Sequence, residues 1–154
     1  MGLEHADPIM GGNGRPKILL VDDDEVLRAV VKEALVSGGY DVESVADGPT
    51  ALAAYIRTRP HLVLTDILMP GCDGLELIRK MRLHDPEARI IAMTGGGTAD
   101  SSLYLTTAAE FGAFHVLQKP FSTKTLLTVI GDVVGVRLPP ESAGQSVKTS
   151  NRNA

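Results

Sequence analysis

Short apolar runs alternate with helix-like segments five times along the chain, and this alternation constrains the fold more than any other feature of the sequence. Most of the runs are rich in Val, Ile and Leu, which is typical of strands buried on both faces of a sheet. A strand followed each time by a helix favours a parallel sheet covered by helices on both sides. The five runs are residues 17–21, 41–45, 61–65, 89–93 and 114–117.

Capping and turn residues mark where the predicted helices begin and end. The first helix should end at Gly38 and Gly39, because glycine readily adopts the backbone conformation that closes a helix. Either Asp47 or Gly48 is expected to cap the second helix, and Ser122 the last one. Residues 71–74 are expected to form a loop, and a helix is predicted over residues 99–111.

Apolar residues at helical spacing predict which face of each helix is buried. In the first helix the predicted buried face consists of Val26, Leu27, Val30, Ala34 and Leu35. In the last helix it consists of Leu126, Leu127, Ile130, Val133 and Val134.

Together these patterns predict an α/β fold with a doubly wound, five-stranded parallel sheet that is covered by helices on both faces. The 154 residues suit a single domain, which we place at residues 16–136. Residues 1–15 are predicted to be a flexible lead-in, and residues 137–154 a polar, disordered tail.

Composition argues against two classes of binding partner and favours one cellular compartment. The net charge is −4 without a basic stripe, which argues against direct binding of nucleic acid. Cys72 is the single cysteine, so no internal disulfide can form and a reducing cytoplasm is favoured. The longest apolar runs are strand-sized and no signal peptide is recognisable, so we expect no membrane partner. These features predict a cytoplasmic protein.

Charged or hydroxyl-bearing side chains follow four of the predicted strands. Residues 22–24 are three aspartates after the first strand, Asp66 follows the third, Thr94 the fourth and Lys119 the fifth. In a parallel sheet the functional groups gather beyond the carboxyl ends of the strands. Crowded carboxylates repel unless a cation shares their site, and one lysine cannot neutralise them all. Mg²⁺ prefers such oxygen ligands, so the sequence predicts a magnesium site.

Four motifs resemble those of the receiver-domain family of two-component signalling, in particular its stand-alone, chemotaxis-regulator-like members. The resemblance covers about residues 16–136 and implies the flavodoxin-like receiver fold, with strand order 2-1-3-4-5. Two helices would then cover one face of the sheet and three the other. The motifs are VDDDE at residues 21–25, TDILMPGCDG at residues 65–74, MTG at residues 93–95 and QKPF at residues 118–121.

The resemblance implies a phosphoacceptor and a metal site. Asp66 would accept a phosphoryl group from a phosphohistidine. Asp23 and Asp66 would bind Mg²⁺ directly, with the backbone carbonyl of Leu68 as a third ligand. Asp22 would complete the acidic pocket through water.

The resemblance also implies how the new phosphoryl group is held. Lys119 would pair with Asp66 at rest and with a phosphoryl oxygen afterwards, and its bond to Pro120 would be cis. Thr94 would donate its hydroxyl to the phosphoryl group. Many receivers carry an aromatic residue three positions before the lysine, but here that position is Val116. The usual movement of an aromatic ring is therefore not expected.

The implied partners are proteins. A sensor histidine kinase or a histidine phosphotransfer protein would supply the phosphoryl group. The segment after residue 136 is too short for a DNA-binding domain. Output would pass through contact with an unknown target protein, or the chain would act as a shuttle or sink in a phosphorelay. Such a protein catalyses only its own phosphorylation and dephosphorylation.

Two alternatives remain at this point. In a haloacid-dehalogenase-like phosphatase, Asp22 would be the nucleophile and Asp24 the general acid. Against it, no pair of acidic residues follows Lys119, because Asp132 stands alone in a helical pattern. The length also leaves no room for a cap domain, and residues 66–74 would go unexplained. In a pseudo-receiver, the domain would bind partners without phosphorylation, which Val116 allows but the retained acidic residues oppose.

Overall fold

The sequence folds into alternating strands and helices in the computed structural model, which describes residues 14–69, 72–95 and 101–135. Most of the predicted lead-in and all of the predicted tail lie outside these residues. The elements in chain order are β1 (Lys17–Val21), α1 (Glu25–Ser37), β2 (Asp41–Val45), α2 (Gly48–Thr58), β3 (Leu62–Asp66), β4 (Leu68–Met69), β5 (Cys72–Asp73), α3 (Gly74–His84), β6 (Ile90–Thr94), α4 (Ser101–Phe111), β7 (His115–Gln118) and α5 (Thr123–Val134).

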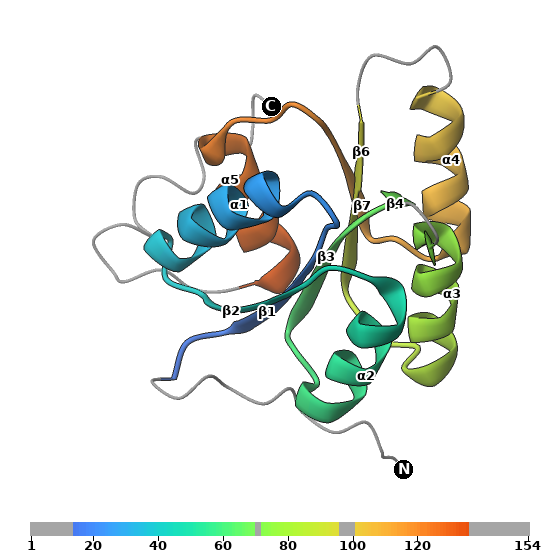
Figure 1. The fold of residues 1–154 in the computed structure, drawn as a ribbon, viewed down its shortest axis with the longest axis horizontal. Coiled ribbons are helices and arrows are strands. Elements are labelled where there is room, and N and C mark those ends of the chain that lie inside the picture. The colour runs from blue at the N-terminus through green and yellow to red at the C-terminus, as the bar shows by residue number, and fades with distance from the viewer. Residues whose placement is uncertain (1–13, 70–71, 96–100, 136–154) are drawn as a thin grey trace.

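Five strands form one parallel sheet in the order β2-β1-β3-β6-β7 (Figure 1). This is the predicted order 2-1-3-4-5 when the short strands β4 and β5 are left out, so the prediction is confirmed. The chain crosses from one side of β1 to the other between β2 and β3. The carboxyl ends of β1 and β3 are therefore neighbours, with β6 next to β3.

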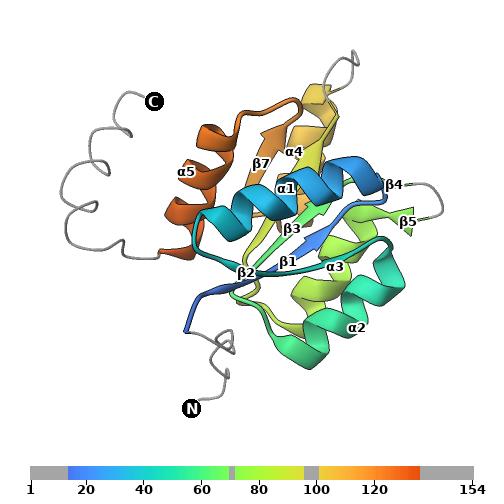
Figure 2. The same ribbon diagram turned by 60° about the vertical axis from the view of Figure 1, so that its left-hand side comes forward.

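Helices α1 and α5 cover one face of the sheet, and α2, α3 and α4 cover the other, as Figures 1 and 2 show. Alternate residues of each buried strand face the two layers. In β1, for example, Leu19 and Val21 pack toward α2 and α3, whereas Ile18 and Leu20 pack toward α1 and α5. The predicted division into three helices and two is confirmed.

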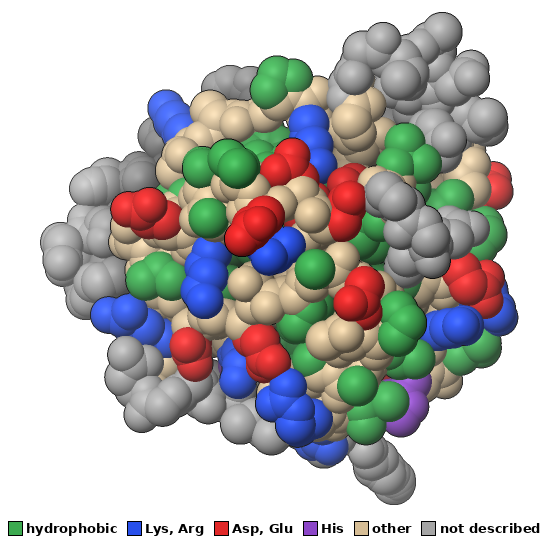
Figure 3. Space-filling view, viewed as in Figure 1, with side chains coloured by type: hydrophobic (Ala, Val, Ile, Leu, Met, Phe, Trp, Pro, Cys, Tyr) green, Lys and Arg blue, Asp and Glu red, His purple; other side chains and the backbone are tan. Residues whose placement is uncertain are grey.

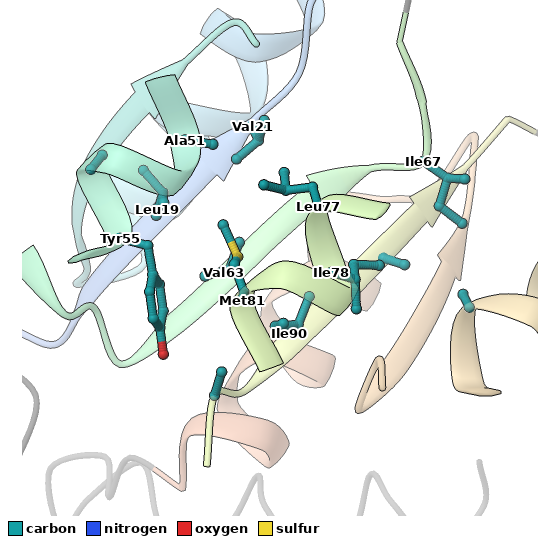
Figure 4. Close-up of a cluster of buried hydrophobic side chains, with 14 of the residues drawn as sticks. Leu19, Val21, Ala51, Tyr55, Val63, Ile67, Leu77, Ile78, Met81 and Ile90 are labelled. Carbon is teal, nitrogen blue, oxygen red and sulfur yellow. The ribbon is translucent and has the colours of Figure 1, made fainter. Parts of the chain in front are cut away.

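The core beneath α2 and α3 is almost wholly aliphatic (Figure 4). Tyr55 is its one aromatic member among the fully buried residues described, and its hydroxyl donates to Asp85 Oδ2 at 2.7 Å. Burial raises the pKa of Tyr55 well above its ordinary value, with the bond to Asp85 as the next cause. This tyrosine thus links α2 to the segment that follows α3.

Several predicted helix caps are confirmed. Asp47 accepts a hydrogen bond from the backbone N–H of Thr50 at 2.8 Å and caps α2. Ser122 accepts from the backbone N–H of Thr125 at 3.0 Å and caps α5. Gly38 closes α1. These caps satisfy backbone groups that have no partner within the helix.

The predicted buried face of α1 is wrong at two positions. Val26 and Val30 are 74% and 58% exposed, whereas Val31 and Leu35 are 3% and 0% exposed. The apolar positions of this helix span about half of its circumference at about 100° per residue. The sheet and α5 cover only part of so wide a stripe, and periodicity alone does not show which part.

The predicted loop at residues 71–74 is also partly wrong. Leu68 and Met69 pair with Asp73 and Cys72 in an antiparallel hairpin, and Gly74 already belongs to α3. Two-residue strands are too short to give a recognisable alternation of apolar and polar residues. Residue 71 itself lies outside the described residues.

No helix in the described part of the chain combines the length and the apolar character that crossing a membrane requires.

Candidate functional site

Three charged side chains from separate strand ends meet at one edge of the sheet. Asp22 follows β1, Asp66 is the last residue of β3, and Lys119 follows β7. The Lys119 Nζ lies 3.2 Å from Asp22 Oδ2 and 3.2 Å from Asp66 Oδ2, although these partners are 97 and 53 residues away in sequence. The parallel sheet makes this possible because it brings the carboxyl ends of its strands to one edge.

A third carboxylate completes the cluster. Asp22, Asp23 and Asp66 each offer an oxygen within 4.8 Å of the others. Asp22 and Asp66 are 1% and 6% exposed, whereas Asp23 is exposed. Figure 3 shows acidic side chains gathered near the centre of one face of the molecule, with lysine and arginine side chains among them. Converging oxygen ligands with more negative than positive charge fit a hard divalent cation such as Mg²⁺.

The environment of Asp66 contains opposing influences. Burial raises the pKa of Asp66 above its ordinary value, and the negative charge of Asp22 acts in the same direction. The ammonium of Lys119 and the backbone N–H of Leu68 both oppose this by favouring the ionised carboxylate. The backbone beyond β3 therefore takes part in holding the Asp66 side chain.

Every polar group of Asp22 has a partner. Its N–H donates to Val45 O at 3.2 Å, and its Oδ1 accepts from the N–H of Asp24 at 2.9 Å. Its Oδ2 accepts from Lys119, and its carbonyl accepts from Arg28 Nη1 at 2.7 Å. Both carboxylate oxygens of Asp22 therefore already accept hydrogen bonds from within the chain.

Thr94 ends β6 on the strand beside Asp66. Its side chain is fully buried, and its Oγ1 has no hydrogen-bond partner within the described residues. The Thr94 carbonyl accepts from the backbone N–H of Lys119 at 2.7 Å, which joins the ends of β6 and β7. A buried hydroxyl without a hydrogen-bond partner destabilises the folded protein.

The structure places the other predicted residues as follows. The Lys119–Pro120 bond is cis, as predicted. Leu68 begins β4 with its side chain 48% exposed. Val116 is half-buried and packs against the core under α2, α3 and α4. Asp24 caps α1, because its Oδ1 accepts from Leu27 N at 3.1 Å.

Two residues with a role at the site were missed by sequence reasoning. A Cβ atom on Gly74 would lie 2.6 Å from both Cα and O of Ile67, and closer still to the carbonyl oxygen of Asp66. Glycine is therefore required for α3 to start against the strand end that carries Asp66. The other missed residue is Arg28 on α1, whose side chain donates a hydrogen bond to the main-chain carbonyl of Asp22 at the end of β1. A pattern of helical spacing contains no signal for such a contact.

Comparison with known proteins decides the family. Residues 18–131 match the profile described as the response regulator receiver domain. The chain belongs to this family. The match spans all the residues of the site described above and excludes the phosphatase interpretation, in which residues 66–74 have no role. Phosphorylation and Mg²⁺ binding are typical of receiver domains.

Curated relatives of the receiver domain differ in length. Sporulation initiation phosphotransferase F of Bacillus subtilis is 36% identical over 126 residues, which are 82% of this chain and 96% of the relative. The DNA-binding transcriptional regulator NtrC of Azospirillum brasilense is 34% identical over 80% of this chain but only 25% of the regulator. Response regulator MprA of Mycobacterium leprae is 35% identical over 87% of this chain and 57% of the regulator. The chain thus spans a quarter to just over half of these longer regulators.

Solved structures show the same fold. A receiver domain protein, described as CheY-like, from Methanospirillum hungatei superposes with a TM-score of 0.71 at 30% identity, covering 79% of this chain and 94% of the other. The chemotaxis response regulator CheY4 of Vibrio cholerae superposes with a TM-score of 0.70 at 30% identity, covering 77% and 98%.

Proposed function

We propose that this receiver domain, spanning residues 16–136, accepts a phosphoryl group on Asp66 in a Mg²⁺-dependent reaction and works as a single-domain response regulator. The observation that carries the proposal is the position of the Lys119 Nζ, 3.2 Å from both Asp22 and Asp66 inside a cluster of three carboxylates. The donor would be the phosphohistidine of a sensor histidine kinase or of a histidine phosphotransfer protein.

The donor set fits the ion that such a reaction needs. Asp23 and Asp66 would hold Mg²⁺ directly, with the Leu68 carbonyl as a third ligand and Asp22 acting through water. The ion, when bound, offsets negative charge on the oxygens of the transferring group. A carboxylate oxygen of Asp66 attacks phosphorus, and the bond from phosphorus to the imidazole nitrogen breaks. The imidazole leaves with the electron pair and takes up a proton.

After transfer, the chain's own residues would hold the product. The new group adds nearly two negative charges at neutral pH. Lys119 would move its ion pair from the Asp66 carboxylate to a phosphoryl oxygen. The Thr94 hydroxyl, which has no hydrogen-bond partner within residues 14–69, 72–95 and 101–135, would donate to another. A full switch needs about 5.5 kcal/mol of differential stabilisation, and one hydrogen bond to a charged group supplies only about 1.5–3 kcal/mol. Both contacts, with repacking of the nearby backbone, would therefore be needed.

The donor would meet an apolar surface beside the acceptor. Val26 and Val30 on α1 are largely exposed, and Leu68 at the site is 48% exposed. The α1 helix begins directly after the acidic residues, so a protein that brings a phosphohistidine to Asp66 would cover these side chains. Replacing Val26 and Val30 by serine should slow transfer from a protein donor and leave labelling by a small-molecule donor unchanged.

The output of the receiver domain is proposed from the length of a relative and from the net charge of the chain. The relative of similar length is named a phosphotransferase, which supports a role as a shuttle or sink in a phosphorelay. The alternative output is contact with a downstream protein. The net charge of −4 favours protein partners over nucleic acid or membrane, and we place the protein in the cytoplasm. The catalysis is limited to its own phosphorylation and dephosphorylation.

The test is labelling by acetyl phosphate with MgCl₂, followed by intact mass. We expect one phosphoryl group on the unchanged chain, none on Asp66→Asn, and none when EDTA removes the metal. Asp132→Asn is the matched control, since Asp132 is an exposed aspartate on α5 and its loss should leave labelling unchanged. A chain that takes no label under any condition would indicate the pseudo-receiver and contradict the proposal.

A further inference from the structure

One side chain outside the carboxylate cluster holds the backbone that carries it. Arg28 lies on α1, and its Nη1 donates to the main-chain carbonyl of Asp22 at 2.7 Å. The Arg28 side chain is half-buried. Since β1 ends at Val21, this carbonyl lies just beyond the strand, where the chain turns into α1. The contact therefore ties the helix to the turn that supplies two of the three carboxylates.

The carbonyl that Arg28 binds belongs to the peptide unit that joins Asp22 to Asp23. A peptide unit is planar, so a hydrogen bond to its oxygen also fixes the direction in which its N–Cα bond enters Asp23. Asp22 is held from three other sides, by Val45, Asp24 and Lys119. Asp23 is exposed, and the direction of its side chain depends on the peptide plane that Arg28 holds.

We propose that Arg28 is a positioning residue for the cation site, and the proposal rests on the function proposed above. Arg28 orients the Asp22–Asp23 peptide unit so that the Asp23 carboxylate converges with those of Asp22 and Asp66. A guanidinium suits this role because it is planar, rigid and always charged, and its bond to a carbonyl is charge-assisted. Its positive charge lies against the main chain of Asp22, one of the residues whose carboxylates repel one another.

The experiment compares Mg²⁺ binding among three variants. Arg28→Met keeps the apolar stem and removes the donor, and Arg28→Lys keeps the charge without the planar fork. Arg89→Met is the matched control, because Arg89 Nη1 also donates to a main-chain carbonyl, that of Val134 at 2.9 Å. Arg89 precedes β6 and so lies at the end of the sheet opposite the site. Each protein is titrated with MgCl₂ by calorimetry, and its stability is measured by urea unfolding.

We expect Arg28→Met to bind Mg²⁺ about 10-fold more weakly, the lower end of the loss seen when outer-shell partners of metal ligands are removed. Arg28→Lys should be weakened in the same way, because a single ammonium on a flexible stem does not fix a peptide plane. Arg89→Met should bind Mg²⁺ like the unchanged chain, even where urea unfolding shows a comparable loss of stability.

Unchanged Mg²⁺ affinity in folded Arg28→Met would overturn the proposal. Full affinity in Arg28→Lys would do so too, because charge alone would then be sufficient, and this variant carries the test if Arg28→Met does not fold. An equal loss in Arg89→Met would show a general effect of stability and likewise overturn it. An unchanged chain that binds no Mg²⁺ contradicts the proposed function itself, which separates the two failures.

Discussion

Replacing Thr94 by valine should make the resting protein more stable while weakening its response to phosphorylation. The Thr94 hydroxyl is fully buried and has no partner in the described part of the chain. Valine has nearly the same shape, so the substitution removes an unsatisfied polar atom without opening a cavity. The Thr94 carbonyl keeps its bond from the Lys119 N–H, because that bond does not involve the side chain.

The size of the effect follows from the cost of leaving a buried polar group unpaired, which is about 1–3 kcal/mol. We expect Thr94→Val to raise the free energy of unfolding by about 1 kcal/mol, the lower end of that range. Thr58→Val is the matched control. Thr58 is also a buried threonine, at 6% exposure, but its Oγ1 donates to Ala54 O at 2.8 Å. Valine there removes a formed hydrogen bond and should lower the free energy of unfolding.

The assay is urea unfolding followed by circular dichroism, without Mg²⁺. The midpoint of Thr94→Val should rise and that of Thr58→Val should fall, with unchanged slopes against urea. Acetyl phosphate should still label Thr94→Val on Asp66, but the accompanying change in amide NMR shifts should be smaller. A midpoint for Thr94→Val below that of the unchanged chain would refute the reasoning, since the hydroxyl would then be contributing to the resting fold.

Three further predictions concern the packing and hydrogen bonds of the fold. Gly74→Ala should lower the free energy of unfolding by about 2–3 kcal/mol in urea, because the added Cβ collides with backbone and overpacking has costs of this size; an effect near zero would contradict the close approach. Burial, and then the charge of Arg89, lower the pKa of His61, whose Nδ1 accepts from the Lys17 N–H. The folded state therefore favours neutral His61. The contribution of His61 to stability is complete above its unfolded pKa of about 6.5 and is lost as the pH falls below that value. Urea midpoints measured from pH 8 to pH 5 should show this loss of stability, and His61→Asn should make the loss smaller. Val31→Ala should cost about 2 kcal/mol in urea unfolding, whereas Val26→Ala should cost almost nothing; equal losses would restore the face of α1 first predicted from the sequence.

The polar residues of the site lie at the edge of a core that is mostly apolar, in which Thr58 and Thr65 are the other buried polar residues among those described. Asp22, Asp66 and Thr94 are among the few buried polar residues described, and all three lie at strand ends. Burial raises the pKa of Asp66, and the Thr94 hydroxyl has no hydrogen-bond partner among the residues that the structure describes. These features are unfavourable in the resting protein, and under the proposed function a cation and a phosphoryl group entering the site would offset them.

Under the proposed function, Val116 would limit how a response to phosphorylation travels through the domain. It is half-buried on β7, opposite Ala92 in the register of β6 and β7, and it packs on the core beneath α4. A branched aliphatic side chain has no ring to rotate between buried and exposed states. We therefore expect the response to pass through the main-chain hydrogen bond between Thr94 and Lys119.

The sequence was enough to predict the sheet and the group of residues at its edge, and its resemblance to receiver domains supplied the strand order. Strands, helix caps and the ends of helices depend on local preferences and on the spacing of apolar residues, so Asp47 and Ser122 could be recognised as caps from their neighbours. The convergence of Asp22, Asp66 and Lys119 followed from the order of parallel strands, since functional groups gather at their carboxyl ends.

Only the tertiary structure decided which side of the wide apolar stripe on α1 is buried, how Gly74 lies against the backbone beyond β3, and that Arg28 holds the carbonyl of Asp22. The physical reason is the same in each case. Periodicity records how often apolar residues recur, but burial and hydrogen bonds depend on what another segment covers. Those contacts arise only when strands and helices pack against one another.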